Sequence, residues 1–91
     1  MPGIYYVKLG QLLRVLEVLY KYYKEGKEPT VSDLIMEGRI SSSSLSIIRQ
    51  RLKEDGYITE AVNPDRTVTI KLTEKGVKLA ECLLKCKELI K

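Results

Sequence analysis

The stretch SSSSLSIIRQRLK at residues 41–53 constrains this chain most, because it has the periodicity of an amphipathic helix. Four consecutive serines are poor helix formers and are also common in flexible linkers. Serine is nevertheless a favoured N-cap, so Ser41 or Ser42 can begin a helix that an apolar stripe then anchors. At about 100° per residue, one narrow arc of this helix holds Leu45, Ile48 and Leu52. We therefore expect a helix over residues 42–54, with that arc in the core.

The opposite face of this helix lacks the mixture of Glu and Lys that a merely solvated face carries. The chain has no acidic residue from Gly38 to Lys53, although acids are common elsewhere in it. Short side chains let a helix approach a partner closely, and basic residues without acids favour a partner of dense negative charge. The outward residues are Ser43, Ser46, Ile47 and Gln50, and the basic ones are Arg39, Arg49, Arg51 and Lys53.

The length of 91 residues indicates one domain, spanning residues 1–91. A chain of this size buries only about 65% of its unfolded surface, so its core is modest and a second subunit would help. The net charge of +4 permits nucleic-acid binding but does not require it.

Several functional classes are disfavoured by the sequence. No apolar run approaches the roughly 20 residues of a membrane span, and the first ten residues lack the features of a secretory signal, so we expect a soluble cytoplasmic protein. The chain has no histidine, and its two cysteines, Cys82 and Cys86, lack partners for a zinc site. No catalytic constellation or glycine-rich phosphate loop is present, so we expect neither an enzyme nor a metal or other cofactor.

The first part of the chain predicts two helices and a tight turn. Leucines and tyrosines from Leu9 to Tyr23 recur at steps of three and four, which predicts a helix ending near Gly26. Tyrosines at this spacing favour core or interface packing over base stacking. Thr30 and Asp33 resemble a capping box that begins a second helix at residues 31–37. Gly38 is suited to the left-handed position after it, which gives a helix-turn-helix.

The last part predicts a hairpin and a long helix. Residues 57–62 and 67–72 alternate with period two, and Asn63-Pro64-Asp65-Arg66 forms the turn between them, with Arg66 at the tip. Thr73 caps a helix over residues 73–91. Its wide apolar arc exceeds what docking on a small domain needs and suggests a partner helix. The arc includes Leu79, Cys82, Leu83, Cys86, Leu89 and Ile90.

This order of elements resembles the winged helix-turn-helix family of DNA-binding regulators. Residues 30–35 (TVSDLI) are similar to the start of that family's second helix, and residues 43–52 (SSLSIIRQRL) to its recognition helix. Residues 52–58 (LKEDGYI) are similar to the turn into the wing, and residues 72–76 (LTEKG) complete the pattern. The resemblance implies an α+β fold with a three-helix core, a two-stranded β-hairpin wing and a C-terminal dimerisation helix. Small dimeric winged-helix proteins of archaea and archaeal viruses are also similar, which would place a viral protein in the host cytoplasm.

The resemblance implies a homodimeric regulator of transcription that binds double-stranded DNA. The recognition helix, residues 42–53, would lie in the major groove, and the wing tip, residues 63–66, at the minor groove or the backbone. Many family members have arginine where this chain has Ile47, which argues against a guanine contact at this position. Ile47 either meets a thymine methyl or is covered by its own protein. The expected DNA-binding residues are Arg39, Ser42, Ser43, Ser46, Ile47, Arg49, Gln50, Lys53 and Arg66.

Other functions remain open from the sequence. Winged helices also serve as protein-interaction modules or adaptor subunits, although an adaptor does not need an acid-free recognition helix. A regulator controlled by a small-molecule effector would need a binding cleft, and no buried charge constellation indicates one. Cys82 and Cys86 lie on one helix face, where they either pack as reduced thiols or form a disulfide between two subunits.

Overall fold

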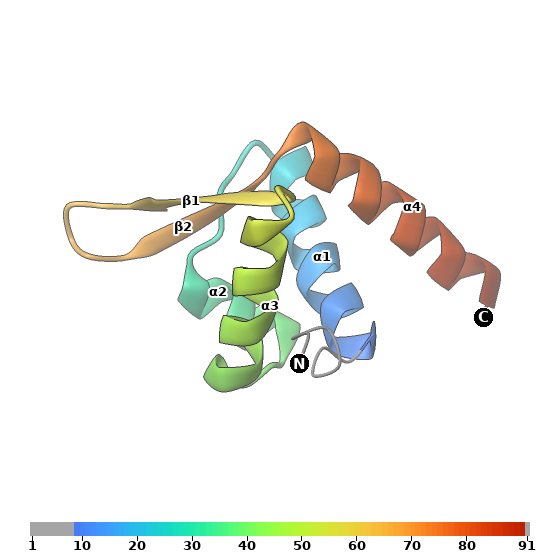
Figure 1. Cartoon of the computed structure of the whole chain (residues 1–91), viewed down its shortest axis with the longest axis horizontal. Helices are drawn as coiled ribbons and strands as arrows, with labels where there is room; N and C mark the ends of the chain where they lie inside the picture. Colours follow the sequence, from blue (N-terminus) through green and yellow to red (C-terminus); the bar gives the residue numbers. More distant parts are fainter. Residues whose placement is uncertain (1–8, 91) are drawn as a thin grey trace.

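The computed structural model (Figure 1) describes residues 9–90, with side chains described through residue 85. The apolar residues 4–7 and the side chain of Cys86 lie outside these limits. Three helices, a two-stranded antiparallel hairpin and a final helix follow one another, which confirms the predicted α+β class. The elements are α1 (Leu9–Lys24), α2 (Val31–Gly38), α3 (Ser42–Glu54), β1 (Ile58–Val62), β2 (Val68–Leu72) and α4 (Glu74–Ile90).

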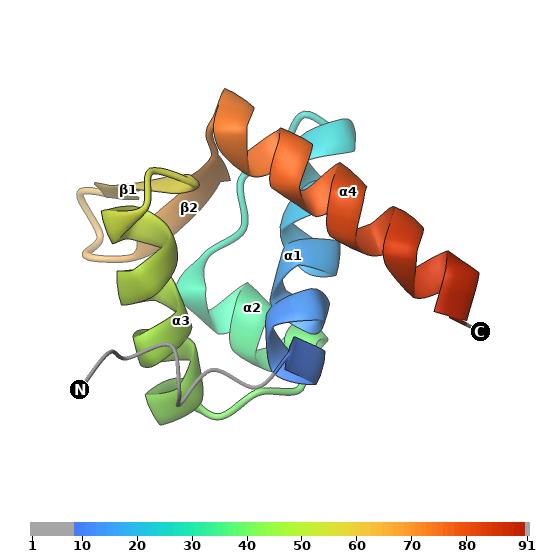
Figure 2. The same ribbon diagram turned by 45° about the vertical axis from the view of Figure 1, so that its right-hand side comes forward.

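The core lies between α1, α2, α3 and the base of the hairpin. The predicted stripe of α3 is buried, because Leu45, Ile48 and Leu52 are only 1%, 1% and 4% exposed. The hairpin projects to one side of this core and α4 extends to the other, as Figures 1 and 2 both show. The side of the molecule that carries α3 and the hairpin is therefore separate from the side that carries the end of α4.

The turn between α2 and α3 differs from the sequence prediction. The capping box is confirmed, since Asp33 N–H donates to Thr30 Oγ1 at 3.1 Å and Thr30 N–H donates to Asp33 Oδ2 at 2.9 Å. The prediction that Gly38 takes the left-handed position is wrong. Gly38 is the buried last residue of α2, and Arg39 is left-handed with φ 52°. Ile40 is buried in the core, so the chain reverses one residue later than glycine alone would indicate.

The hairpin is tied to both of its neighbours. Each strand begins one residue later than predicted, because Tyr57 N–H donates to the Leu52 carbonyl at the end of α3 and Thr67 bonds within the turn. Ile70 N–H also donates to the Pro29 carbonyl at 2.9 Å, next to a bridge between Thr30 and Thr69. The segment before α2 therefore fixes the base of the hairpin relative to the helix-turn-helix.

Helix α4 is anchored at its start. Thr73 accepts from Gly76 N–H at 3.1 Å, as expected of a cap, and its hydroxyl donates to the Gly56 carbonyl at 2.6 Å. Ala80 is fully buried against the core, and Tyr20 of α1 donates a hydrogen bond to Glu81 at 2.9 Å. Farther along the apolar arc, Leu79 and Leu83 are half-buried and Cys82 is exposed. Part of the arc of α4 is thus left uncovered within the described chain.

Candidate nucleic-acid interface

The outward face of α3 is open to a partner. Ser41 is the N-cap, and its Oγ accepts from Ser44 N–H at 3.2 Å, so the serine run begins the helix instead of forming a linker. Ile47 is 40% exposed, a large value for an isoleucine in a small domain. Together these side chains form a surface of short, hydrogen-bonding and apolar groups. The exposed residues of this face are Ser42, Ser43, Ser46, Ile47 and Gln50.

Two predicted phosphate-binding residues are paired with an acid that sequence reasoning missed. Arg49 Nε lies 2.7 Å from Glu60 Oε2, and Lys53 Nζ lies 3.3 Å from Glu60 Oε1. The Arg49 guanidinium and then the Lys53 ammonium hold the pKa of Glu60 below its usual value, although burial opposes them. This cluster therefore contributes a net charge of about +1 instead of the +2 expected from α3 alone.

A signal for this pairing is present in the sequence. Period-two alternation places Glu60 on the same strand face as Ile58, which is buried. An acid on an inward strand face needs a partner, and the free cations of α3 were the candidates. The Glu60 side chain is 13% exposed and that of Arg49 is 25% exposed, so both are largely covered.

Arg51 does not belong to this face. It is half-buried, and its Nε lies 3.4 Å from Asp55 Oδ2 one helical turn later. It borders an apolar groove of about 210 Å³ between α1, α3 and α4, on the inner side of α3. The groove is lined by Leu12, Ile48, Arg51, Leu52, Asp55, Tyr57, Leu79 and Leu83.

The hairpin turn presents Arg66 on a loop that is closed by hydrogen bonds. Thr67 donates through its N–H and its hydroxyl to Asp65 Oδ1, at 3.1 and 2.6 Å, and these bonds lower the pKa of Asp65. Arg66 is exposed with φ 70°, and its N–H donates to the Asn63 carbonyl at 2.9 Å. Arg39, also exposed, lies in the turn before α3. Arg39 thus belongs to the turn directly before α3, and Arg66 belongs to the hairpin turn that follows β1.

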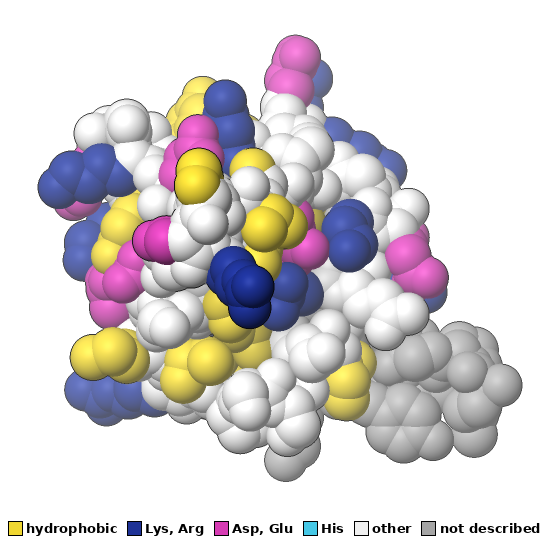
Figure 3. Space-filling view, turned by 90° about the vertical axis from the view of Figure 1, so that its left-hand side faces the viewer, with side chains coloured by type: hydrophobic (Ala, Val, Ile, Leu, Met, Phe, Trp, Pro, Cys, Tyr) yellow, Lys and Arg dark blue, Asp and Glu magenta, His cyan; other side chains and the backbone are white. Residues whose placement is uncertain are grey.

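Figure 3 shows the side of the molecule from which the hairpin projects. Lys and Arg side chains are spread over this view, including its centre and its left edge, between hydrophobic and acidic side chains. The surface is therefore mixed in charge, and its positive character depends on individual basic residues.

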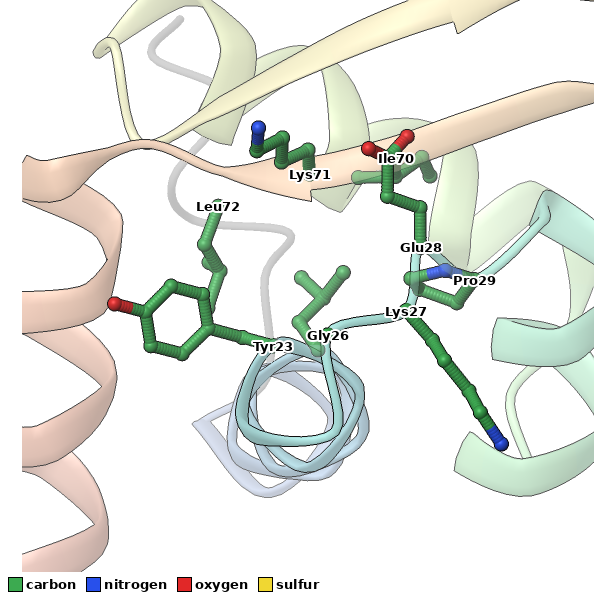
Figure 4. Close-up of a pocket in the computed structure, with 9 residues that line it drawn as sticks. Tyr23, Gly26, Lys27, Glu28, Pro29, Ile70, Lys71 and Leu72 are labelled. Carbon is green, nitrogen blue, oxygen red and sulfur yellow. The ribbon is translucent and has the colours of Figure 1, made fainter.

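A second hollow lies behind the hairpin (Figure 4). It measures about 220 Å³ and is bordered by the end of α1, the following loop and β2. Tyr23 and Leu72 lie beside one another at its wall, whereas Lys27 extends away from it. The polar groups do not converge on one point, so the hollow does not define a catalytic or ligand site.

Among the described residues, no three His, Cys, Asp or Glu side chains group to hold a metal ion, and none of the described helices has the length and apolarity of a membrane span.

The helix-turn-helix, the exposed face of α3 and the projecting hairpin define a winged helix-turn-helix domain. The family model described as the ArnR1-like winged-helix domain matches residues 3–90, and the chain belongs to this family. None of the curated proteins compared with the chain matches it.

Solved structures share this fold at low sequence identity. AF1382 of Archaeoglobus fulgidus is 19% identical with a TM-score of 0.84, and the match covers 99% of this chain and 98% of that one. MepR, a transcription regulator of the Staphylococcus aureus multidrug efflux pump MepA, is 21% identical with a TM-score of 0.74. That match covers 88% of this chain, which spans 58% of the MepR chain. A MepR–DNA complex from the same organism is 21% identical with a TM-score of 0.73, covering 92% of this chain and 67% of that one.

Proposed function

We propose that this protein is a transcriptional regulator that binds specific sequences of double-stranded DNA as a homodimer. The observation that carries the proposal is the outward face of α3, where Ser43, Ser46, Ile47 and Gln50 are exposed and the helix has no acid before Glu54. The major groove is about 12 Å wide and admits a helix with such short side chains. The similarity to MepR, which has been solved bound to DNA, supports this class of partner.

Each group of interface residues has a separate role in the proposal. Ser42, Ser43, Ser46, Ile47 and Gln50 meet base edges or nearby phosphates, and Ile47 contacts a thymine methyl. Arg39, Arg49 and Lys53 bind the phosphate backbone beside the major groove. Arg66 reaches the minor groove or its phosphates from the tip of the hairpin. A regulator of this kind acts in the cytoplasm, needs no cofactor and catalyses no reaction.

The dimer is formed by α4 in this proposal, over residues 73–91 of a single domain. The exposed part of the α4 apolar arc and the adjoining groove beside α1 and α3 are apolar surface that a second copy would cover. A two-fold dimer would present two α3 helices about 34 Å apart, one turn of the double helix. A disulfide through Cys82 or Cys86 would then make the dimer covalent.

The experiment that tests this function is a selection of bound duplexes from random double-stranded DNA, using the full chain. We expect enrichment of one sequence made of two inverted half-sites about 10 base pairs apart, centre to centre. Enrichment of a single half-site would contradict the dimer and leave specific binding intact. A pool that stays random, with binding that does not weaken as salt rises, would refute DNA binding and favour an adaptor role.

A further inference from the structure

Glu60 lies inside the surface that the proposed function assigns to DNA. The hollow between α3 and the hairpin is lined by Ser46, Arg49, Gln50, Lys53, Glu54 and Glu60. Glu60 therefore shares this hollow with Ser46 and Gln50, which are candidate base-contacting residues. A duplex in contact with that face would bring phosphates close to a carboxylate.

The pairing occupies both cations of α3 that would otherwise meet phosphates. Arg49 is held at 2.7 Å and is mostly covered, whereas Lys53 is held at 3.3 Å and its side chain is 57% exposed. An ammonium that already contacts a carboxylate has less attraction for a phosphate, and the carboxylate itself repels the phosphate. Both effects act on any DNA sequence, because phosphate contacts carry no sequence information.

We propose that Glu60 is a residue of the DNA-binding surface that weakens sequence-independent DNA binding. By pairing with Arg49 and Lys53 it reduces the phosphate contribution that all duplexes share. The contribution from base contacts through Ser43, Ile47 and Gln50 is unchanged, so discrimination between sequences rests on it. A contribution that all duplexes share cancels from the ratio of two affinities, so Glu60 lowers the affinity for selected and random duplexes by the same factor and limits binding to the many competing sites. This inference rests on the proposed function.

The test compares Glu60→Gln with wild type and with Glu28→Gln. Glutamine keeps the shape of Glu60 and removes its charge, and Glu28 is an exposed acid in the loop after α1, away from α3. Affinities for the selected duplex and for random duplexes are measured over a series of salt concentrations. For E60Q we expect at least about threefold tighter binding to both random DNA and the selected duplex, with the ratio of the two affinities unchanged. Each freed cation steepens the fall of log K against log salt by about 0.9, and one or two cations are freed per subunit. E28Q should leave both affinities and the slope at their wild-type values.

A second pair of variants separates this role from a structural one. Lys53→Gln should weaken random binding more in the E60Q background than in wild type, because Glu60 no longer competes with phosphates for the Lys53 ammonium there. If Glu60 merely fastens the hairpin to α3, E60Q will lower the melting temperature and weaken binding to both duplexes, which overturns the inference. If E60Q and E28Q bind the duplexes with equal affinity, the inference is overturned too. The proposed function then still stands, provided that the wild type binds DNA. Failure of wild type to bind any duplex overturns both.

Discussion

Arg39 and Arg66 share a left-handed backbone conformation, with φ of 52° and 70°. Among the described residues they are the two non-glycine positions with positive φ, and both belong to the expected DNA-binding set. A residue with a Cβ pays about 1–2 kcal/mol for this conformation, which glycine adopts readily. A strained residue retained where glycine would fit indicates a need for its side chain.

Replacing either arginine by glycine should therefore weaken DNA binding while leaving the free energy of unfolding nearly unchanged. For Arg66→Gly we expect a free energy of unfolding within about 1 kcal/mol of wild type, because relief of strain offsets the greater chain entropy of glycine. Its affinity for selected and random duplexes should fall by the same factor, since a phosphate contact is lost. Arg39→Gly should behave alike. Thermal unfolding and duplex titration measure the two quantities.

The matched control keeps the charge. Arg66→Lys retains the positive φ and the cation, so it should keep most of the affinity. A large loss of stability in R66G with unchanged DNA affinity would assign Arg66 to the architecture of the turn alone.

The order of elements and the local caps could be predicted from the sequence because their causes are local. Thr30 and Asp33 are three residues apart and form their capping box without help from the rest of the chain. The stripe of Leu45, Ile48 and Leu52 likewise follows from helical spacing. Gly38 was misplaced because the burial of Ile40, a tertiary effect, decides where the chain reverses.

The candidate site was predicted less completely than the fold. The exposed face of α3 follows from its buried face, so Ser43, Ser46 and Gln50 could be located from periodicity. Glu60 is 11 residues from Arg49, and their contact depends on how the hairpin packs against α3. The spacing of residues in the sequence does not determine how the hairpin packs against α3. The sequence therefore gives the cations of the interface but not the anion that pairs with them.

Gln50 provides a test of base recognition. A glutamine in the major groove can pair with adenine through two hydrogen bonds, which discriminate by roughly 1–3 kcal/mol. Gln50→Ala should therefore bind the selected duplex about 5- to 150-fold more weakly, with little change for random DNA. Lys53→Ala serves as the comparison and should weaken both equally, if at all. An equal loss on both duplexes for Q50A would argue against base contact.

Two glycines in early helical turns should respond oppositely to alanine. A Cβ on Gly76 of α4 would overlap the Tyr57 carbonyl oxygen at the start of the hairpin, whereas no atom of the described residues lies within 4 Å of a Cβ on Gly10. Gly76→Ala should destabilise the fold by about 3 kcal/mol or more, because backbone must move. Gly10→Ala should be neutral or stabilise by up to about 1 kcal/mol. Chemical denaturation measures both, and similar values for the two would contradict the close approach of α4 to Tyr57.

The Tyr22 hydroxyl should titrate at a higher pH than a tyrosine with an ordinary pKa. Its hydroxyl donates to the Glu37 carboxylate, which Lys21 also contacts at 3.1 Å, and this bond raises the pKa of Tyr22 from 10.0 to about 12. The folded pKa is raised, so the stabilisation is present below pH 10 and is lost as pH rises through about 12. Ultraviolet absorbance of the phenolate follows the titration. Tyr22→Phe should remove the late step, Glu37→Gln should move it toward 10, and Glu74→Gln should leave it in place.

The proposed disulfide between subunits can be tested through the two cysteines of α4 separately. Cys82 is exposed in the single chain and lies four residues before Cys86, and helical spacing predicts that the two residues share one side of the helix. Side chains in this arrangement run side by side, a poor geometry for a bond within one helix, so a bridge would join two chains. After mild oxidation, we expect a dimer band on a denaturing gel without reductant, and a monomer band once reductant is added. Cys82→Ser and Cys86→Ser identify the bridging position, because only one of them should abolish the band if the symmetric pair is a single residue. A monomer band for the oxidised wild type excludes the bridge, and a monomeric mass by light scattering at micromolar concentration would remove the dimer as well.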